Sequence, residues 1–261
     1  MRGLGKKIVT RIEAINKVIN QYGQVTIRQI YYRLLGDLGA PYRQIQYACK
    51  IGRRQGLISK SGIVDRSRPI YGKKLFNELR DFLDGTPETF HLDFWNDSDV
   101  RPEIWTEKDA LSQILYAEAR RYNVDVYVTR GFLSDSNKYR WGGENKAIMY
   151  FGDFDASGLF IDKDLEFSVV FKNFERKALT QNQIEEHKLP SVAVNKSDPR
   201  SLGYIKRYGD VGWEIDALDP NLLREMVRAA IEQYINFDVE RKRDEEEKVR
   251  ERLRDLLEGL E

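Results

Sequence analysis

The sequence predicts an α/β fold in two parts. A basic, mostly helical domain is expected over residues 1–85, and a domain with helices flanking a parallel sheet over residues 100–237. Two observations lead to this prediction: charge is segregated along the chain, and beyond residue 100 short strand-like apolar segments alternate with amphipathic helical ones. The densely charged segment 238–261 is expected to be a C-terminal helix or a frayed end.

The net charge of +1 hides a strong asymmetry. Residues 1–74 contain 16 Lys and Arg against 3 Asp and Glu, a charge of +13, whereas the remaining residues contain 27 against 39, a charge of −12. A basic domain suits the binding of a polyanion, because Lys and Arg neutralise phosphates. A solvated basic surface is the alternative.

Cysteine and histidine content restricts the chemistry. Cys49 is the one cysteine of the sequence, which excludes an intramolecular disulfide, and His91 and His187 are its two histidines. A zinc site of His and Cys ligands is therefore not expected, and a metal would need oxygen ligands. No run of residues is long and apolar enough for a membrane helix or a secretion signal, so we expect a cytoplasmic protein without a membrane partner.

The basic region carries the pattern of a winged helix. Apolar residues at three- and four-residue spacing predict helices over residues 4–21, 27–38 and 42–56, and residues 56–69 predict two short strands around a turn. This is the element order of a helix-turn-helix fold that places a helix in the major groove of double-stranded DNA; a plain helical domain is the alternative. The cations expected to contact DNA phosphates are Arg43, Lys50, Arg53, Arg54, Arg66 and Arg68.

Three carboxylates follow predicted strands of the second domain. Glu107 comes after the strand of residues 103–106, and Asp153 and Asp155 come after the strand of residues 146–152. Since parallel strands deliver their carboxyl ends to one edge, these side chains are expected to meet, and a hard cation such as Mg2+ would relieve their repulsion. A solvated turn and a charge at a helix N-terminus are the alternatives.

These motifs resemble a known family. WTEKDAL followed by YFGDFDASG is similar to the Toprim domain of topoisomerases, bacterial primases and overcoming-lysogenization-type nucleases. Within that group the similarity is greatest to the DNA-cleaving subunit of DNA topoisomerase VI and to its relative, the meiotic double-strand-break transesterase. RGFLSDS, ERKALT and EIDALDP add looser similarity. The resemblance implies a winged helix before a Toprim domain, and Mg2+, for which Mn2+ can substitute, held by Glu107, Asp153 and Asp155.

The resemblance also implies a tyrosine nucleophile in the segment TIRQIYYRLL. Tyr31 lies on the apolar stripe of the predicted helix, whereas Tyr32 is turned off it, one helical turn after Arg28. A guanidinium beside a phenol, whose pKa is ordinarily ~10, would favour the phenolate. Tyr32 is therefore the candidate nucleophile, assisted by Arg28 and Glu107, and a packing role is the alternative.

The function expected first is Mg2+-dependent DNA cleavage by tyrosine transesterification, with a phosphotyrosyl intermediate and a homodimer. A Toprim endonuclease using metal-activated water is the alternative, and a non-catalytic DNA-binding protein is the second. Strand passage, as in a full topoisomerase, would need a separate ATPase subunit. Lys108 is expected to be solvated or to neutralise phosphate. A further strand is predicted over residues 212–218, and its Glu214 and Asp216 are expected to approach the metal or to start a helix.

Overall fold

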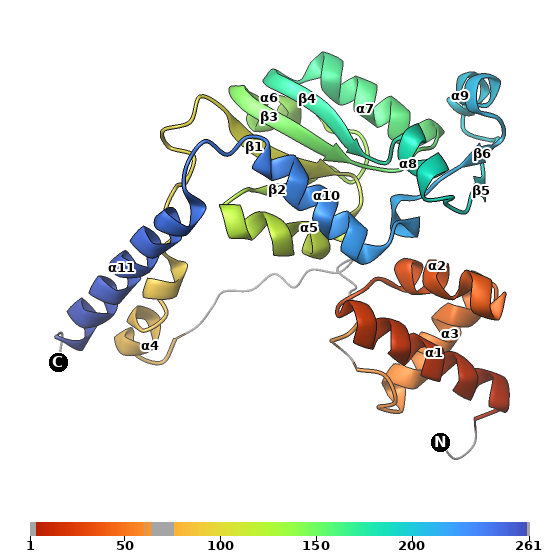
Figure 1. Cartoon of the computed structure of the whole chain (residues 1–261), viewed down its shortest axis with the longest axis horizontal. Helices are drawn as coiled ribbons and strands as arrows, with labels where there is room; N and C mark the ends of the chain where they lie inside the picture. Colours follow the sequence, from red (N-terminus) through yellow and green to blue (C-terminus); the bar gives the residue numbers. More distant parts are fainter. Residues whose placement is uncertain (1–3, 60, 64–75, 260–261) are drawn as a thin grey trace.

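The structure, a computed structural model, describes residues 4–59, 61–63 and 76–259. Figure 1 shows a helical unit near the N-terminus, a sheet unit with helices on both of its faces, and an arm formed by the C-terminal helix. The hydrophobic cluster of the helical unit shares no member with those of the sheet unit among the described residues. The chain thus builds its cores separately.

Helices α1 (Lys6–Tyr22), α2 (Ile27–Leu38) and α3 (Tyr42–Arg54) form the helical unit, as the apolar spacing predicted. Thr26 caps α2 in a reciprocal pair of hydrogen bonds with Gln29. The predicted wing is not confirmed: residues 56–59 and 61–63 contain turns and a single parallel bridge from Ile63 to Val25, and residues 60 and 64–69 lie outside the described chain.

The connector to the sheet unit is mostly irregular. It contains the short helix α4 (Leu79–Leu83) and the 3-10 turn η1 (Pro87–Thr89). A buried Trp95 fixes its last part, because the indole N–H donates to the carbonyl of Tyr122 at 2.8 Å.

The main sheet is parallel, as predicted. In the described part of the chain its four strands run in the order β2-β1-β3-β4. Their bounds are Arg101–Thr106 (β1), Val126–Val128 (β2), Gly143–Phe151 (β3) and Phe171–Ala178 (β4). Thr106 is opposite Phe151, so β1 and β3 end at the same edge.

Helices cover both faces of this sheet (Figure 1). On one face, Ile104 and Met149 pack against α5 (Ser112–Ala119) and α10 (Pro220–Glu232). On the other, Trp105 and Tyr150 pack against α6 (Asp135–Trp141) and α7 (Ala156–Ser168). The 3-10 turns η2 (Asp109–Leu111) and η3 (Arg120–Tyr122) flank α5. An α/β fold with helices on both sides of a parallel sheet is confirmed.

The chain after β4 differs from the prediction. It forms α8 (Gln181–Glu186), β5 (Val192–Ala193), α9 (Ser201–Tyr208) and β6 (Val211–Gly212). The strand predicted over residues 212–218 forms only at its start, in β6 and in a bridge from Trp213 to Phe154, because the 3-10 turn η4 (Ile215–Ala217) follows. Glu214 and Asp216 therefore lie on a tight turn.

The densely charged C-terminal segment is a helix, α11 (Val239–Glu258). Its one buried residue, Glu246, accepts hydrogen bonds from the backbone N–H of Leu92 at 2.7 Å and from the side chain of Asn123 at 3.1 Å. These bonds fix the base of the arm to the sheet unit. Among the described helices, none is apolar over a length that would cross a membrane.

Candidate active site

The parallel pairing of β1 and β3 brings two of the predicted carboxylates together. Glu107 leaves the end of β1 and Asp153 leaves the end of β3 two residues after Phe151. The Oε1 atom of Glu107 accepts a hydrogen bond from the backbone N–H of Asp153 at 2.9 Å, and its Oε2 atom accepts one from the hydroxyl of Tyr150. The carboxylate of Glu107 is thus held against the neighbouring strand.

Asp153 is the buried carboxylate of this edge, with a side chain that is 13% exposed. Its Oδ1 atom accepts a hydrogen bond from the backbone N–H of Ile215 at 2.8 Å and lies 2.9 Å from the Nζ atom of Lys108. Burial raises the pKa of Asp153 to about 7; the charge of Glu107 acts in the same direction and the ammonium of Lys108 opposes it.

Lys108 turns inward, so the expectation of a solvated lysine is wrong, and a role in neutralising phosphate stays a prediction. Its Nζ atom lies 2.6 Å from Oδ2 of Asp216 and 3.8 Å from Oε2 of Glu214, in addition to its contact with Asp153. Burial alone would lower the pKa of Lys108, but these carboxylates outweigh it and raise the pKa. Lys108 is therefore the internal cation of an acidic cluster.

Asp155 serves as a helix cap. Its Oδ1 atom accepts a hydrogen bond from the backbone N–H of Gly158 at 2.7 Å, at the start of α7. Only glycine fits at 158, because a Cβ there would lie 2.3 Å from the carbonyl oxygen of Asp153. The loop between β3 and α7 is consequently tight, and one oxygen of Asp155 is already engaged.

Glu107 and Asp153 are the residues that could hold a divalent cation. Mg2+ commonly takes only one or two protein carboxylates and completes its shell with water and phosphate oxygens, so this pair has suitable donor chemistry. Within residues 4–59, 61–63 and 76–259, however, no group of three or more His, Cys, Asp or Glu side chains is arranged to hold a metal ion. The ligand set that includes Asp155 stays a prediction.

Arg176 on β4 organises the loop that carries both aspartates. Its guanidinium donates to the backbone carbonyls of Gly152 at 3.0 Å, Asp153 at 3.2 Å and Gly158 at 3.3 Å, and pairs with the carboxylate of Asp162. No sequence pattern predicted a role for Arg176. Its position within ERKALT, a segment that resembles the family, is the sequence feature that could have indicated a role for Arg176.

The helical unit meets the same edge through polar contacts. Arg28 lies 3.1 Å from Glu214, and the Thr26 hydroxyl donates to Asp216 at 3.1 Å. Farther along, the Tyr22 hydroxyl donates to Asp219 at 2.7 Å, and Arg33 lies 3.4 Å from the same carboxylate. Helix α2 is thereby held over the turn that also contacts Lys108. We call this set of contacts the polar junction.

Tyr32 lies at this junction with its hydroxyl covered. The residue is 7% exposed, and its hydroxyl has no hydrogen-bond partner in the described parts of the chain. Burial and the charge of Glu214 raise the pKa of Tyr32, and Arg28 only partly offsets them. Helical spacing placed Tyr32 off the apolar stripe of α2, yet it is buried because the sheet unit covers it.

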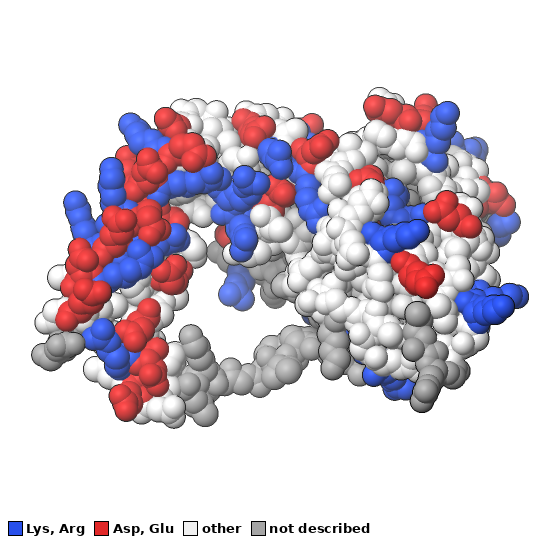
Figure 2. Space-filling view, turned by 60° about the horizontal axis from the view of Figure 1, so that its bottom comes forward, with Lys and Arg blue, Asp and Glu red and all other residues white. Residues whose placement is uncertain are grey.

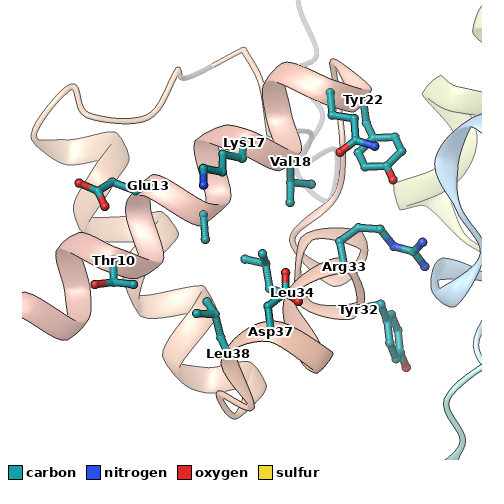
Figure 3. A pocket seen from close by; sticks show the side chains of 12 residues that line it. Thr10, Glu13, Lys17, Val18, Tyr22, Tyr32, Arg33, Leu34, Asp37 and Leu38 are labelled. Carbon is teal, nitrogen blue, oxygen red and sulfur yellow. The ribbon is translucent and has the colours of Figure 1, made fainter.

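Figure 3 shows Tyr32 and Arg33 at the end of a cavity between α1 and α2 that is nearest to the sheet unit. The cavity measures about 850 Å3, and its lining includes Glu13, Lys17 and Asp37. Arg33 points out of it toward Ala217, whose carbonyl accepts a hydrogen bond from the guanidinium.

Three of the four predicted DNA-contacting cations of α3 lie on one face of the helix. Arg43, Lys50 and Arg54 are exposed, and Arg53 is half-buried. The spacing of residues 43, 47, 50 and 54 places them on one helical face, and Tyr47, for which the sequence pattern predicted no role, is 52% exposed between them. Arg66 and Arg68 lie outside the described residues. Helix α3 therefore presents a basic face with an aromatic side chain.

No protein-family model matches the chain, and no curated protein is significantly similar to it.

Proposed function

We propose that this protein is a DNA-cleaving enzyme whose reaction takes place at the shared edge of β1 and β3 and depends on Mg2+. The observation that carries the proposal is the location of Glu107 and Asp153 at two adjacent strand ends, where the Glu107 carboxylate accepts a hydrogen bond from the backbone N–H of Asp153. The similarity of their surrounding motifs to Toprim domains supports the same function.

In this proposal, each residue near the shared end of β1 and β3 has its own role. Glu107 and Asp153 would hold Mg2+, which supplies charge stabilisation at a phosphate and activation of a bound water. Lys108 neutralises the acidic cluster, so that a phosphodiester can approach Asp153 with less repulsion. Arg176 keeps the loop of Asp153 in place, and the basic face of α3 binds the DNA backbone.

Two nucleophiles are compatible with this edge, and water is the better supported. Tyrosine transesterification, the route expected first from the sequence, needs a phenol that loses its proton, whereas Tyr32 is buried and its pKa is raised. Attack by water leaves Tyr32 buried and therefore needs no movement of α2, whereas attack by Tyr32 requires the phenol to become exposed. The specific observation that favours the tyrosine is the location of Arg28 and Tyr32 at the junction with Glu214, beside the same edge.

The test is cleavage of supercoiled plasmid DNA with Mg2+ or Mn2+, stopped with denaturant and run with and without proteinase. Asp153→Asn should abolish cleavage, and the matched control Asp210→Asn, at an exposed carboxylate paired with Lys196, should retain it. With water as nucleophile, Tyr32→Phe cleaves like the parent and no DNA stays bound to protein. With tyrosine as nucleophile, Tyr32→Phe is inactive and the parent yields protein-linked DNA.

Tight DNA binding without cleavage in either metal would contradict the proposal and favour the non-catalytic DNA-binding protein. Light scattering tests the homodimer, which the tyrosine route requires if the nucleophile of one protomer acts at the metal of another. A separate ATPase subunit belongs to the proposal only if the protein passes strands, and plasmid relaxation that requires an added ATPase would be its signature.

A further inference from the structure

A second groove with many arginines lies away from the strand edge, between α11 and the η3 end of α5. It measures about 740 Å3. Among the described residues, the arginines that line it are Arg101, Arg120, Arg121, Arg243 and Arg250, and the carboxylates are Asp93, Asp125 and Glu246. Four of these arginines, Arg101, Arg121, Arg243 and Arg250, have a carboxylate partner among the described residues, and Arg120 has none. Figure 2 shows Lys and Arg side chains gathered between α11 and the body of the molecule.

The walls of this groove are fixed by hydrogen bonds. Glu246 ties α11 to Leu92 and Asn123, and Arg243 donates to the backbone carbonyl of Arg121 at 2.8 Å. Arg250 lies 2.6 Å from Glu246. The groove is therefore formed before a ligand arrives, which lowers the entropy lost on binding.

Two of the arginines are available to an anion. Arg120 is exposed and forms no ion pair with any described residue. Arg121 has a side chain that is 49% exposed, and its carboxylate partner, Glu118, lies 3.5 Å away. Arg101, Arg243 and Arg250, in contrast, are paired with Asp93, Glu240 and Glu246. The positive charge that a ligand would meet is thus concentrated on η3.

The groove continues toward the candidate active site. Tyr116, which is 49% exposed, lines it and also lines a second groove of about 400 Å3. That second groove is bounded by Asp109, Ser112 and Arg130. Residues 112 and 116 are on α5 and residue 120 follows at the start of η3, at four-residue spacing, and Asp109 is two residues from Glu107. A track about 12 Å long therefore runs from Arg120 past Tyr116 to Ser112, toward the segment that follows β1.

We propose that this track binds single-stranded DNA, with phosphates on Arg120 and Arg121 and a base stacked on Tyr116. Cations alternating with an exposed aromatic side chain are the chemistry that single strands require, because phosphates need charge and unpaired bases need a stacking surface. The inference rests on the proposed function, since it assigns a path for a strand that runs to the cleavage site.

The test is the binding of fluorescently labelled oligo-dT to the full chain in EDTA, measured by anisotropy over a range of salt concentrations. Arg120→Gln/Arg121→Gln should reduce the slope of log affinity against log salt by about 1.4, at about 0.7 per lost phosphate contact. The charge-matched control Arg241→Gln/Arg252→Gln changes exposed arginines of α11 outside the groove and should leave the slope unchanged. Tyr116→Ala should bind about 5- to 150-fold more weakly and Tyr116→Phe like the parent, from ~1–3 kcal/mol per stacked base.

Equal slopes for the groove variant and its control would overturn the proposal, as would equal affinities of Tyr116→Ala and Tyr116→Phe. Equal losses for oligo-dT and for a duplex of the same length would overturn the assignment to single strands. Because binding is measured without metal, the result is independent of cleavage. Groove-dependent binding without plasmid cleavage would refute the proposed function alone, and cleavage without groove-dependent binding would refute this inference alone.

Discussion

Arg176→Met should destabilise the protein strongly. The guanidinium is 12% exposed, donates to the carbonyls of Gly152, Asp153, Gly158 and Leu179, and pairs with Asp162, whose side chain is 15% exposed. Methionine can fill the volume but cannot donate. The substitution leaves a buried carboxylate without its cation and several carbonyls without a donor.

Removing one partner of a buried ion pair costs about 3–5 kcal/mol, and we expect a loss of about 4 kcal/mol here. At about 2–4 °C per kcal/mol, the melting temperature should fall by about 8–16 °C. Urea unfolding and a thermal melt measure both quantities. Arg207→Met, at an exposed arginine above the ring of Tyr208, is the control and should melt like the parent.

Asp162→Asn in the Arg176→Met background should recover part of the loss, because it removes the unpaired charge. A melting temperature for Arg176→Met within about 2 °C of the parent would refute the reasoning, since the guanidinium would then contribute no more than an exposed one.

Three other variants probe the phenol, the buried aspartate and the arm. Tyr32→Phe should raise the free energy of unfolding by about 1 kcal/mol, because it removes a buried hydroxyl that has no hydrogen-bond partner among the described residues. If a urea titration shows that the free energy of unfolding falls by about 1 kcal/mol instead, the hydroxyl forms a hydrogen bond in the folded protein. Asp153 has a pKa of about 7, above its ordinary value, so the folded state holds the proton more tightly and stability in EDTA falls as the pH rises toward 7. The free energy of unfolding of Asp153→Asn, measured relative to that of the parent, should therefore increase by about 2 kcal/mol as the pH rises from about 5 to about 8. A decrease would contradict the raised pKa of Asp153. Glu246→Ala should release the base of α11 and speed proteolysis within that helix, whereas the exposed Glu251→Ala should not; equal rates for both would mean that Glu246 does not anchor the arm.

Much of the sheet was predictable from local pattern. The segments that form β1 and β3 are apolar and lie directly before Glu107 and Asp153, and the parallel sheet follows from the alternation of strands and helices along the chain. β4 was missed because its sequence, FKNFERKA, mixes apolar and charged residues, as suits a strand at the edge of the sheet. The strand predicted over residues 212–218 ended early because η4 turns the chain toward α2.

The candidate site was only partly predictable, because side-chain directions there depend on distant segments. The proximity of Glu107 and Asp153 follows from strand order alone. The inward turn of Lys108 depends on Glu214 and Asp216, which lie more than a hundred residues later in the chain. Likewise, the burial of Tyr32 depends on the packing of α2 against η4, and no helical periodicity contains that information.

The polar junction determines when the hydroxyl of Tyr32 becomes accessible to a phosphate. Its contacts are charges and hydroxyls, so water, salt and competing anions can replace them at modest cost, unlike contacts within a hydrophobic core. An anion that draws Arg28 away from Glu214 would favour molecules in which the helical unit has lifted from the sheet. If Tyr32 is the nucleophile, its access to a phosphate would depend on the fraction of such open molecules.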